Sequence, residues 1–92
     1  MNWITGIQRA KNYIEEHLTE EVDIEEAAKQ AYSSPFHFQR VFSIICSFTV
    51  GDYIRMRRLS LAAEELQNGA KVIDTALKYG YETPESFSRA FT

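Results

Sequence analysis

The chain carries two copies of one segment of its own sequence. Residues 27–42 and 76–91 align without a gap at an offset of 49, and seven of the sixteen positions are identical. In each copy a short helical pattern leads through a turn into Ser-Pro or Thr-Pro, which mark a helix start because the hydroxyl caps backbone N–H groups and Pro fits the first helical position. A repeated helix–turn–helix unit therefore limits the fold more than any other feature. The identical pairs are Ala27/Ala76, Lys29/Lys78, Tyr32/Tyr81, Pro35/Pro84, Phe38/Phe87, Arg40/Arg89 and Phe42/Phe91.

The rest of the chain predicts helices that support and join the two copies. Apolar residues recur at helical spacing, and no alternating strand pattern competes with them. Asp23 with Glu26 resembles a capping box, and Asn68-Gly69 is a stop signal. Helices are expected at about 3–18, 24–31, 35–45, 51–67, 72–79 and from 84 onward. The predicted fold is all-α, with two homeodomain-like three-helix units, 1–49 and 69–92, joined by a long linker helix at 50–68.

Helical spacing also predicts which side chains are buried. We expect Tyr32 and Tyr81 to hold the same position in the two turns, as core or turn packing. The lone Cys46 is interpreted as a small buried hydrophobic residue. The expected apolar stripes are Ile4, Ile7, the Lys11 stem, Ile14 and Leu18; Phe38, Val41, Phe42 and Ile45; and Tyr53, Met56, Leu59, Ala63 and Leu66.

Composition excludes several classes of protein. The 92 residues are 45% hydrophobic, which suits one small domain with a core or two very small lobes that share a helix. The sequence contains no run of eighteen apolar residues, so no membrane span is predicted. A single cysteine fits a reducing cytoplasm. No nucleophile–base pair or Gly-rich phosphate loop is present, and His17 and His37 have no partner at ligand spacing. We therefore predict no enzyme activity, no cofactor and no metal.

Charge is unevenly distributed along the chain. The net charge of −3 is unusual for a protein that binds nucleic acid. Residues 1–34 hold three basic and seven acidic residues, whereas residues 35–60 hold four arginines and one aspartate. The middle of the chain can therefore present a positive face if the acidic cluster at 15–26 points elsewhere. Modest affinity for DNA is expected, because phosphate neutralisation supplies much of it.

The second helix of each copy carries the differences between the copies. Phe36, His37 and Gln39 stand opposite Glu85, Ser86 and Ser88, whereas the shared positions are mostly apolar or turn residues. In a helix-turn-helix protein this second helix reads base edges in the major groove. Two different reading helices predict an asymmetric site. A linker of about 17 residues, about 26 Å long, can hold them roughly one DNA turn apart.

The segments DIEEAAKQAYSSPFHFQRVF and VIDTALKYGYETPESFSRAF resemble the two helix-turn-helix motifs of the AraC/XylS family of bacterial transcription regulators, and YIRMRRLSLAAEELQ resembles its linker helix. The resemblance implies sequence-specific binding of double-stranded DNA and contact with RNA polymerase. A small-molecule effector would act only through a domain absent here. The base-facing residues that the resemblance implies are Phe36, Gln39, Arg40, Glu85, Ser86, Ser88 and Arg89.

The family pattern continues beyond residue 92 with a short segment and a last helix. We therefore expect the second subdomain to lack its C-terminal helix here, with its apolar face near Phe87 and Phe91 uncovered. An N-terminal DNA module resembles the subgroup in which an effector domain follows.

Each functional interpretation has a structural alternative. Phe36 could pack against Trp3 rather than reach a base, and Arg40 could form an ion pair. The arginines at 55, 57 and 58 could contact phosphates or pair with Glu64, Glu65 or Asp74. The whole chain could instead be an acidic helical module that contacts RNA polymerase or a regulatory domain.

Overall fold

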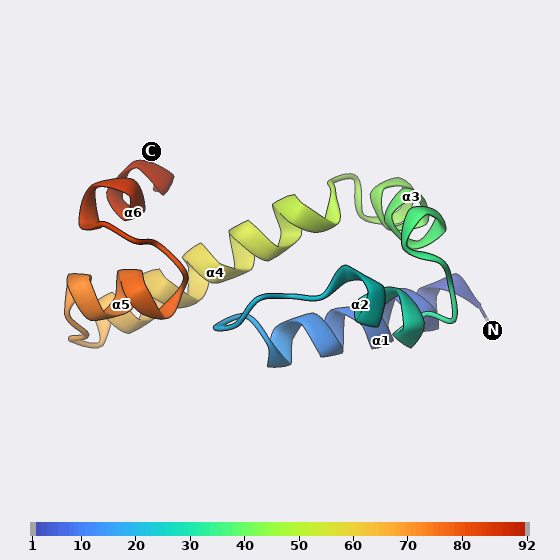
Figure 1. Ribbon diagram of the computed structural model, residues 1–92, viewed down its shortest axis with the longest axis horizontal. Helices are drawn as coiled ribbons and strands as arrows, with labels where there is room; N and C mark the ends of the chain where they lie inside the picture. The colour runs from blue at the N-terminus through green and yellow to red at the C-terminus, as the bar shows by residue number, and fades with distance from the viewer. Residues whose placement is uncertain (1, 92) are drawn as a thin grey trace.

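A computed structural model describes residues 2–91, and all regular secondary structure in that range is helical, which confirms the predicted all-α fold (Figure 1). Each predicted helix boundary lies within two residues of the observed one. The helices are α1 (Trp3–Glu16), α2 (Ile24–Gln30), α3 (Pro35–Cys46), α4 (Val50–Gln67), α5 (Val72–Lys78) and α6 (Pro84–Ala90).

Side-chain caps explain where most of these helices begin. Each capping side chain accepts a hydrogen bond from a backbone N–H of the first turn, and the caps of α1, α2, α3, α4 and α6 are Asn2, Asp23, Ser34, Thr49 and Thr83. Helix α5 starts after Lys71, which makes no side-chain cap. The expected reciprocal bond of a capping box is replaced in α2, where the Glu26 carboxylate accepts from Lys29 Nζ at 3.4 Å.

Two hydrophobic cores share the long helix. The first core joins α1, α2, α3 and the start of α4, and includes Ile14, Phe42 and Ile54. The second core is smaller and gathers Ala62, Ala76, Tyr79 and Phe87, from α4, α5, the residue after α5 and α6. Leu61 packs against both cores. Helix α4 therefore forms the central rod of an elongated molecule of 43 × 22 × 20 Å (Figure 1).

The predicted apolar stripes are partly wrong. Ile4, Ile45 and Met56 are exposed. In α3 the buried row continues from Phe38 and Phe42 to the half-buried Cys46 rather than to Ile45. Helix α4 buries Val50, Ile54 and Ala62. It turns different faces to the two cores, so one continuous stripe does not describe it.

The turns of the two motifs differ in length by one residue, which the gapless alignment missed. The buried residues Ala27, Ala28 and Ala31 correspond to Thr75, Ala76 and Tyr79, at an offset of 48. The capping and buried residues of α3 and α6 correspond at an offset of 49. The second turn therefore contains one additional residue before its helix begins.

The prediction that Tyr32 and Tyr81 hold the same turn position is therefore wrong. Tyr32 takes a left-handed conformation with φ of 54°, and its counterpart in the second turn is Gly80, with φ of 87°. Tyr32 is 71% exposed. Tyr81 is half-buried, and its ring centroid lies 5.3 Å from that of Phe87.

The apolar face near Phe87 and Phe91, expected to be uncovered, is covered at Phe87 and open at Phe91. Phe87 is fully buried and contacts the rings of Tyr81 and Phe91. Phe91 is exposed, as are Val72, Ile73 and Leu77 of α5.

Candidate nucleic-acid interface

Helices α3 and α6 lie near opposite ends of the molecule, on the same side of it in Figure 1, and each is seen nearly end-on. Each helix has a phenylalanine anchor at the equivalent position, Phe38 in α3 and Phe87 in α6, and both are almost completely buried. The buried anchor defines the inner face of each helix, so residues on the opposite face point toward solvent. These residues are at positions 36, 39 and 40 in α3 and at positions 85, 88 and 89 in α6. These positions are exposed in the structure.

The three predicted site residues of α3 form an open surface. Phe36 is 75% exposed and so does not pack against Trp3, the alternative considered from sequence. Trp3 instead contacts His37 edge-on, with ring centroids 5.3 Å apart. Gln39 donates from Nε2 to the Pro35 carbonyl at 3.2 Å, and Arg40 is exposed beside it. This surface combines an exposed ring, an amide and a guanidinium group.

The four predicted site residues of α6 fall into two groups. Glu85, Ser88 and Arg89 are exposed. Ser86 is half-buried, and its hydroxyl donates to the Thr83 carbonyl at 2.9 Å and accepts from Thr83 Oγ1 at 3.1 Å. The Ser86 side chain therefore completes the N-terminal cap of α6, while the other three residues face solvent.

The turn of the first motif is held by a residue that sequence reasoning did not single out. Arg9 of α1 donates from Nε to the Gln30 carbonyl at 2.9 Å, and its guanidinium carbon lies 5.3 Å from the centroid of the Tyr32 ring. Arg9 therefore caps the end of α2 and covers the left-handed residue after it. A basic residue on α1 gave no local signal, because its partner is 21 residues away.

The linker arginines have partners other than those expected. Arg55 pairs with Asp52 one turn earlier. Arg58 donates from Nε to the Leu18 carbonyl at 2.9 Å and from Nη2 to the Glu20 carbonyl at 2.7 Å. These bonds tie α4 to the segment that follows α1, so Arg58 positions the first core against the linker.

The third linker arginine, Arg57, joins a network at the junction of α1 and α4. Its Nη2 and Nε donate to the two carboxylate oxygens of Glu15 at 2.9 and 3.0 Å, and the Tyr53 hydroxyl donates to the same carboxylate at 2.9 Å. The hydrogen bonds from Arg57 lower the pKa of Glu15. Burial, together with the bond to Glu15, raises the pKa of Tyr53 to about 12.

A second network joins α4 to the end of α5. Lys78 donates from Nζ to one carboxylate oxygen of Glu65 at 2.6 Å, and the Tyr79 hydroxyl donates to the other. The hydrogen bond from Lys78 lowers the pKa of Glu65. Burial and the bond to Glu65 raise the pKa of Tyr79 to about 12. Sequence reasoning named Glu65 only as a possible partner of a linker arginine.

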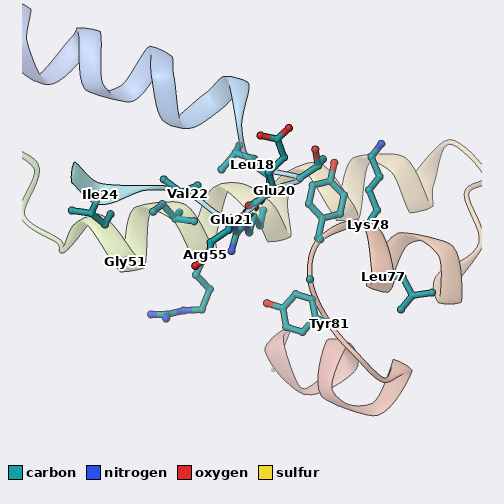
Figure 2. A pocket seen from close by; sticks show the side chains of 15 residues that line it. Leu18, Glu20, Glu21, Val22, Ile24, Gly51, Arg55, Leu77, Lys78 and Tyr81 are labelled. Carbon is teal, nitrogen blue, oxygen red and sulfur yellow. Dashed lines mark hydrogen bonds between the residues drawn. The ribbon is translucent and has the colours of Figure 1, made fainter. Parts of the chain in front are cut away.

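A groove of about 740 Å³ lies beside α4, between the segment after α1 and the end of α5 (Figure 2). Residues 18–22, Ile24, one face of α4 and residues 77–81 line it, and they include the carboxylates of Glu20 and Glu21. Its cations, Arg55, Arg58 and Lys78, all bond to neighbouring protein groups. The groove is therefore a junction between the two cores, and its three cations already donate to neighbouring protein groups.

Within 2–91, no three His, Cys, Asp or Glu side chains are grouped so that they could hold a metal ion. In the same range, none of the helices combines the length and the apolar character needed to cross a bilayer.

The geometry defines a class of protein: two helix-turn-helix units on a shared helix, each with an exposed second helix. A family model described as "Helix-turn-helix domain" matches residues 27–92. A crystal structure of an AraC-type transcriptional regulator from Chromobacterium violaceum has the same fold, with a TM-score of 0.84 and 20% identity over 94% of this chain and 78% of that one.

Curated relatives agree with the structural match. The regulatory protein SoxS of Escherichia coli K12 is 40% identical over 86 residues, which cover 92% of this chain and 80% of SoxS. The uncharacterized HTH-type transcriptional regulator YbfP of Bacillus subtilis is 38% identical over 92 residues, and the chain spans only 31% of its length.

The chain belongs to the AraC-type helix-turn-helix family of transcription regulators and is a DNA-binding domain of that family. This confirms the resemblance found in the sequence. The alternative, an acidic protein-interaction module, does not fit these relatives.

Proposed function

We propose that this chain binds one asymmetric DNA site, with α3 and α6 in two successive major grooves. The observation that carries the proposal is the position of two exposed helices near the ends of a molecule 43 Å long, on one side of it (Figure 1). Successive major grooves on one face of B-DNA are about 34 Å apart. The molecule is long enough for both helices to be inserted at once.

The proposed base and phosphate contacts of each residue follow from the exposed side chains of the two helices. Gln39 suits an adenine edge, the arginines at 40 and 89 suit guanine or a phosphate, and Phe36 suits a thymine methyl group. Glu85 can accept from a cytosine amino group, and Ser88 can bond a base or a phosphate. Ser86 acts mainly by capping α6. Because the exposed chemistry of α3 is partly apolar and that of α6 is polar, the two half-sites should differ in sequence.

The proposed subdomains are 1–49 and 69–92, with residues 50–68 as the linker. The two cores support this division, since each gathers one motif onto its own part of α4. Binding rather than catalysis is the proposed activity, and the bacterial cytoplasm, where the chromosome lies, is the proposed location.

We propose two partners other than DNA, RNA polymerase and a small-molecule effector. RNA polymerase is a candidate because exposed carboxylates gather on α1, α2 and the segment between them, including Glu16, Glu21 and Glu25. Such a face is repelled by phosphate and suits a basic protein surface. An effector would act through another domain of the native protein.

Selection of duplexes from a random-sequence pool, followed by shift assays in a salt series, tests the proposal. We expect a selected site with two separate conserved blocks and affinity that falls steeply as salt rises. Arg40→Ala and Arg89→Ala should each weaken the selected site by roughly 1–3 kcal/mol and change the preferred base at one position. Lys29→Ala removes the same charge from α2 and should lower affinity without changing base preference.

A pool that shows no enrichment would contradict the proposal. So would enrichment of a single block whose sequence is unchanged by both arginine variants, because only one helix, or neither, would then be reading bases.

A further inference from the structure

The two networks on α4 have the same design with donors and acceptor exchanged. In the first, the carboxylate of Glu15 on α1 accepts from Tyr53 and Arg57 of α4. In the second, the carboxylate of Glu65 on α4 accepts from Tyr79 and Lys78 at the end of α5. We call these the α1 clamp (residues 15, 53 and 57) and the α5 clamp (residues 65, 78 and 79). Each joins the linker helix to one subdomain through one carboxylate, one hydroxyl and one cation.

Packing fixes the direction of the tyrosine hydroxyl in both clamps. The Tyr53 ring lies edge-on to Phe42, at 5.7 Å between centroids, and stacks with Phe48 at 6.3 Å. Tyr79 is only 5% exposed and belongs to the second core. A hydroxyl on a packed ring has little freedom to follow a moving carboxylate. The clamps should therefore resist rotation of each subdomain about α4.

Two ion pairs within single helices differ from the clamps in geometry. Asp52 with Arg55 and Glu26 with Lys29 are exposed pairs three residues apart on one helix, so each links a helix to itself. Exposed pairs of this kind contribute little. The two clamps instead join different elements. The bonded residues are 38 to 42 positions apart in the sequence in the α1 clamp and 13 to 14 positions apart in the α5 clamp.

Between the clamps the rod is continuous. Residues 53 and 65 lie on the same helix, about 18 Å apart along its axis at 1.5 Å per residue. Neither Gly nor Pro occurs from 52 to 67, so nothing in this stretch favours a kink. The orientation of α3 relative to α6 therefore depends on how each subdomain is fixed to its end of the rod.

We propose that the α1 and α5 clamps set the separation and rotation of α3 relative to α6, and thereby determine which spacing of half-sites the protein accepts. The proposal rests on the two-groove binding proposed above and assigns its spacing specificity to residues that do not touch DNA. One base pair more or less between half-sites rotates the second by about a tenth of a turn. A rigid molecule cannot follow that rotation, whereas a loosened one can.

The first experiment measures the protein without DNA. Spin labels at Ile44→Cys on α3 and Glu82→Cys before α6, in a Cys46→Ser background, report the distance between the reading helices. The double variant Glu15→Gln/Glu65→Gln should broaden this distance distribution at least about twofold. Glu16→Gln/Glu64→Gln makes the same change of charge at the neighbouring residues and should leave the distribution narrow. An equally narrow distribution in both double variants would overturn the proposal.

The second experiment uses the duplex selected from the random pool, with zero, one or two base pairs inserted or removed between its two blocks. The unmodified chain should lose at least about tenfold in affinity per altered base pair. Glu15→Gln/Glu65→Gln should bind the altered duplexes within about threefold of the original. The milder variant Tyr53→Phe/Tyr79→Phe removes only the hydroxyls, and it should also bind the altered duplexes with a smaller loss of affinity than the unmodified chain. It serves as a second test if the glutamate variant does not fold.

The outcomes separate this inference from the proposed function. If both clamp variants lose the same factor at every spacing, the clamps contribute only stability and the inference is wrong, although two-groove binding stands. If the pool yields no bipartite site, two-groove binding fails, and the spin-label distances still decide whether the clamps hold the two helices in place.

Discussion

At the scale of single residues, the two motifs place different residue types at the left-handed position of the turn. The second residue after the first helix of each motif takes a left-handed conformation, which costs a non-glycine residue roughly 1–2 kcal/mol. The second motif places Gly80 there, whereas the first places Tyr32. The stack of Arg9 over the Tyr32 ring offsets part of that cost. The first turn therefore depends on a contact from α1 that the second turn does not require.

Glycine at position 80 should matter more than glycine at position 51. Gly80→Ala should destabilise the fold by about 1 kcal/mol, because alanine at a φ of 87° is strained even though a methyl group there would meet no neighbouring atom. Gly51→Ala is the control: it lies in the first turn of α4, and the nearest atom to an added methyl group is Thr49 Oγ1 at 3.8 Å. Urea unfolding followed by circular dichroism measures both. Equal effects would show that backbone strain is not the cause.

The tyrosines of the two clamps predict a loss of stability at high pH. Tyr53 and Tyr79 have pKa values raised from 10.0 to about 12, so the folded state holds these protons more tightly than the unfolded state. Their contribution is complete below pH 10 and is lost as the pH rises toward 12. The urea midpoint should therefore decrease as the pH is raised from 10 to 11.5, inside the window set by these values, and it should decrease less in Tyr53→Phe/Tyr79→Phe. Parallel curves for parent and variant would contradict this.

At the scale of secondary-structure elements, α5 is the helix whose start is least well supported. It begins after Lys71 without a side-chain cap, and a cation there opposes the positive end of the helix dipole. Lys71→Asp should therefore stabilise the fold by about 1 kcal/mol, and Asp23→Ala, which removes the cap of α2, should destabilise it by a similar amount. Thermal unfolding measures both. A lower melting temperature for Lys71→Asp would mean that Lys71 has another structural role.

The elements also show how far sequence reasoning reached. Helices, caps and the paired anchors Phe38 and Phe87 were predictable, because they depend on local spacing and on residues that cap within one turn. The extra residue in the second turn was not predictable. Identical Tyr, Lys and Ala residues favoured a gapless alignment, whereas the first helices of the two motifs correspond at an offset of 48. The exposure of Ile45 and Met56 was missed because it depends on how α3 and α4 rotate against their neighbours.

The candidate site was predictable to a similar extent. The exposure of Phe36, Gln39, Arg40, Glu85, Ser88 and Arg89 follows from the helical period once the anchors are known. The capping bond of Ser86 was missed because its position three residues after Thr83 reads equally well as an exposed helix residue. The role of each residue toward DNA stays a prediction. The clamps lie beyond sequence reasoning, since Glu15 meets Tyr53 and Arg57 only through the tertiary fold.

At the scale of the whole molecule, the linkage of two DNA-binding helices must offset the weak electrostatic attraction of an acidic chain to DNA. A net charge of −3 gives little general attraction to DNA, so each reading helix alone should bind weakly. In the proposed two-groove mode the two helices bind as a linked pair, because after the first helix is bound the second faces its half-site at high effective concentration. The rod is therefore a source of affinity as well as of spacing.

This linkage makes affinity a steep function of duplex length. A duplex that carries both selected half-sites should bind at least about a hundredfold more tightly than a duplex of the same length in which one half-site is scrambled. Shortening the intact duplex until one half-site is cut away should produce the same loss in one step rather than gradually, since an incomplete half-site cannot seat its helix. Fluorescence anisotropy at fixed salt measures both series. If the scrambled and intact duplexes bind alike, one motif alone accounts for binding, and the second subdomain must be assigned a different role.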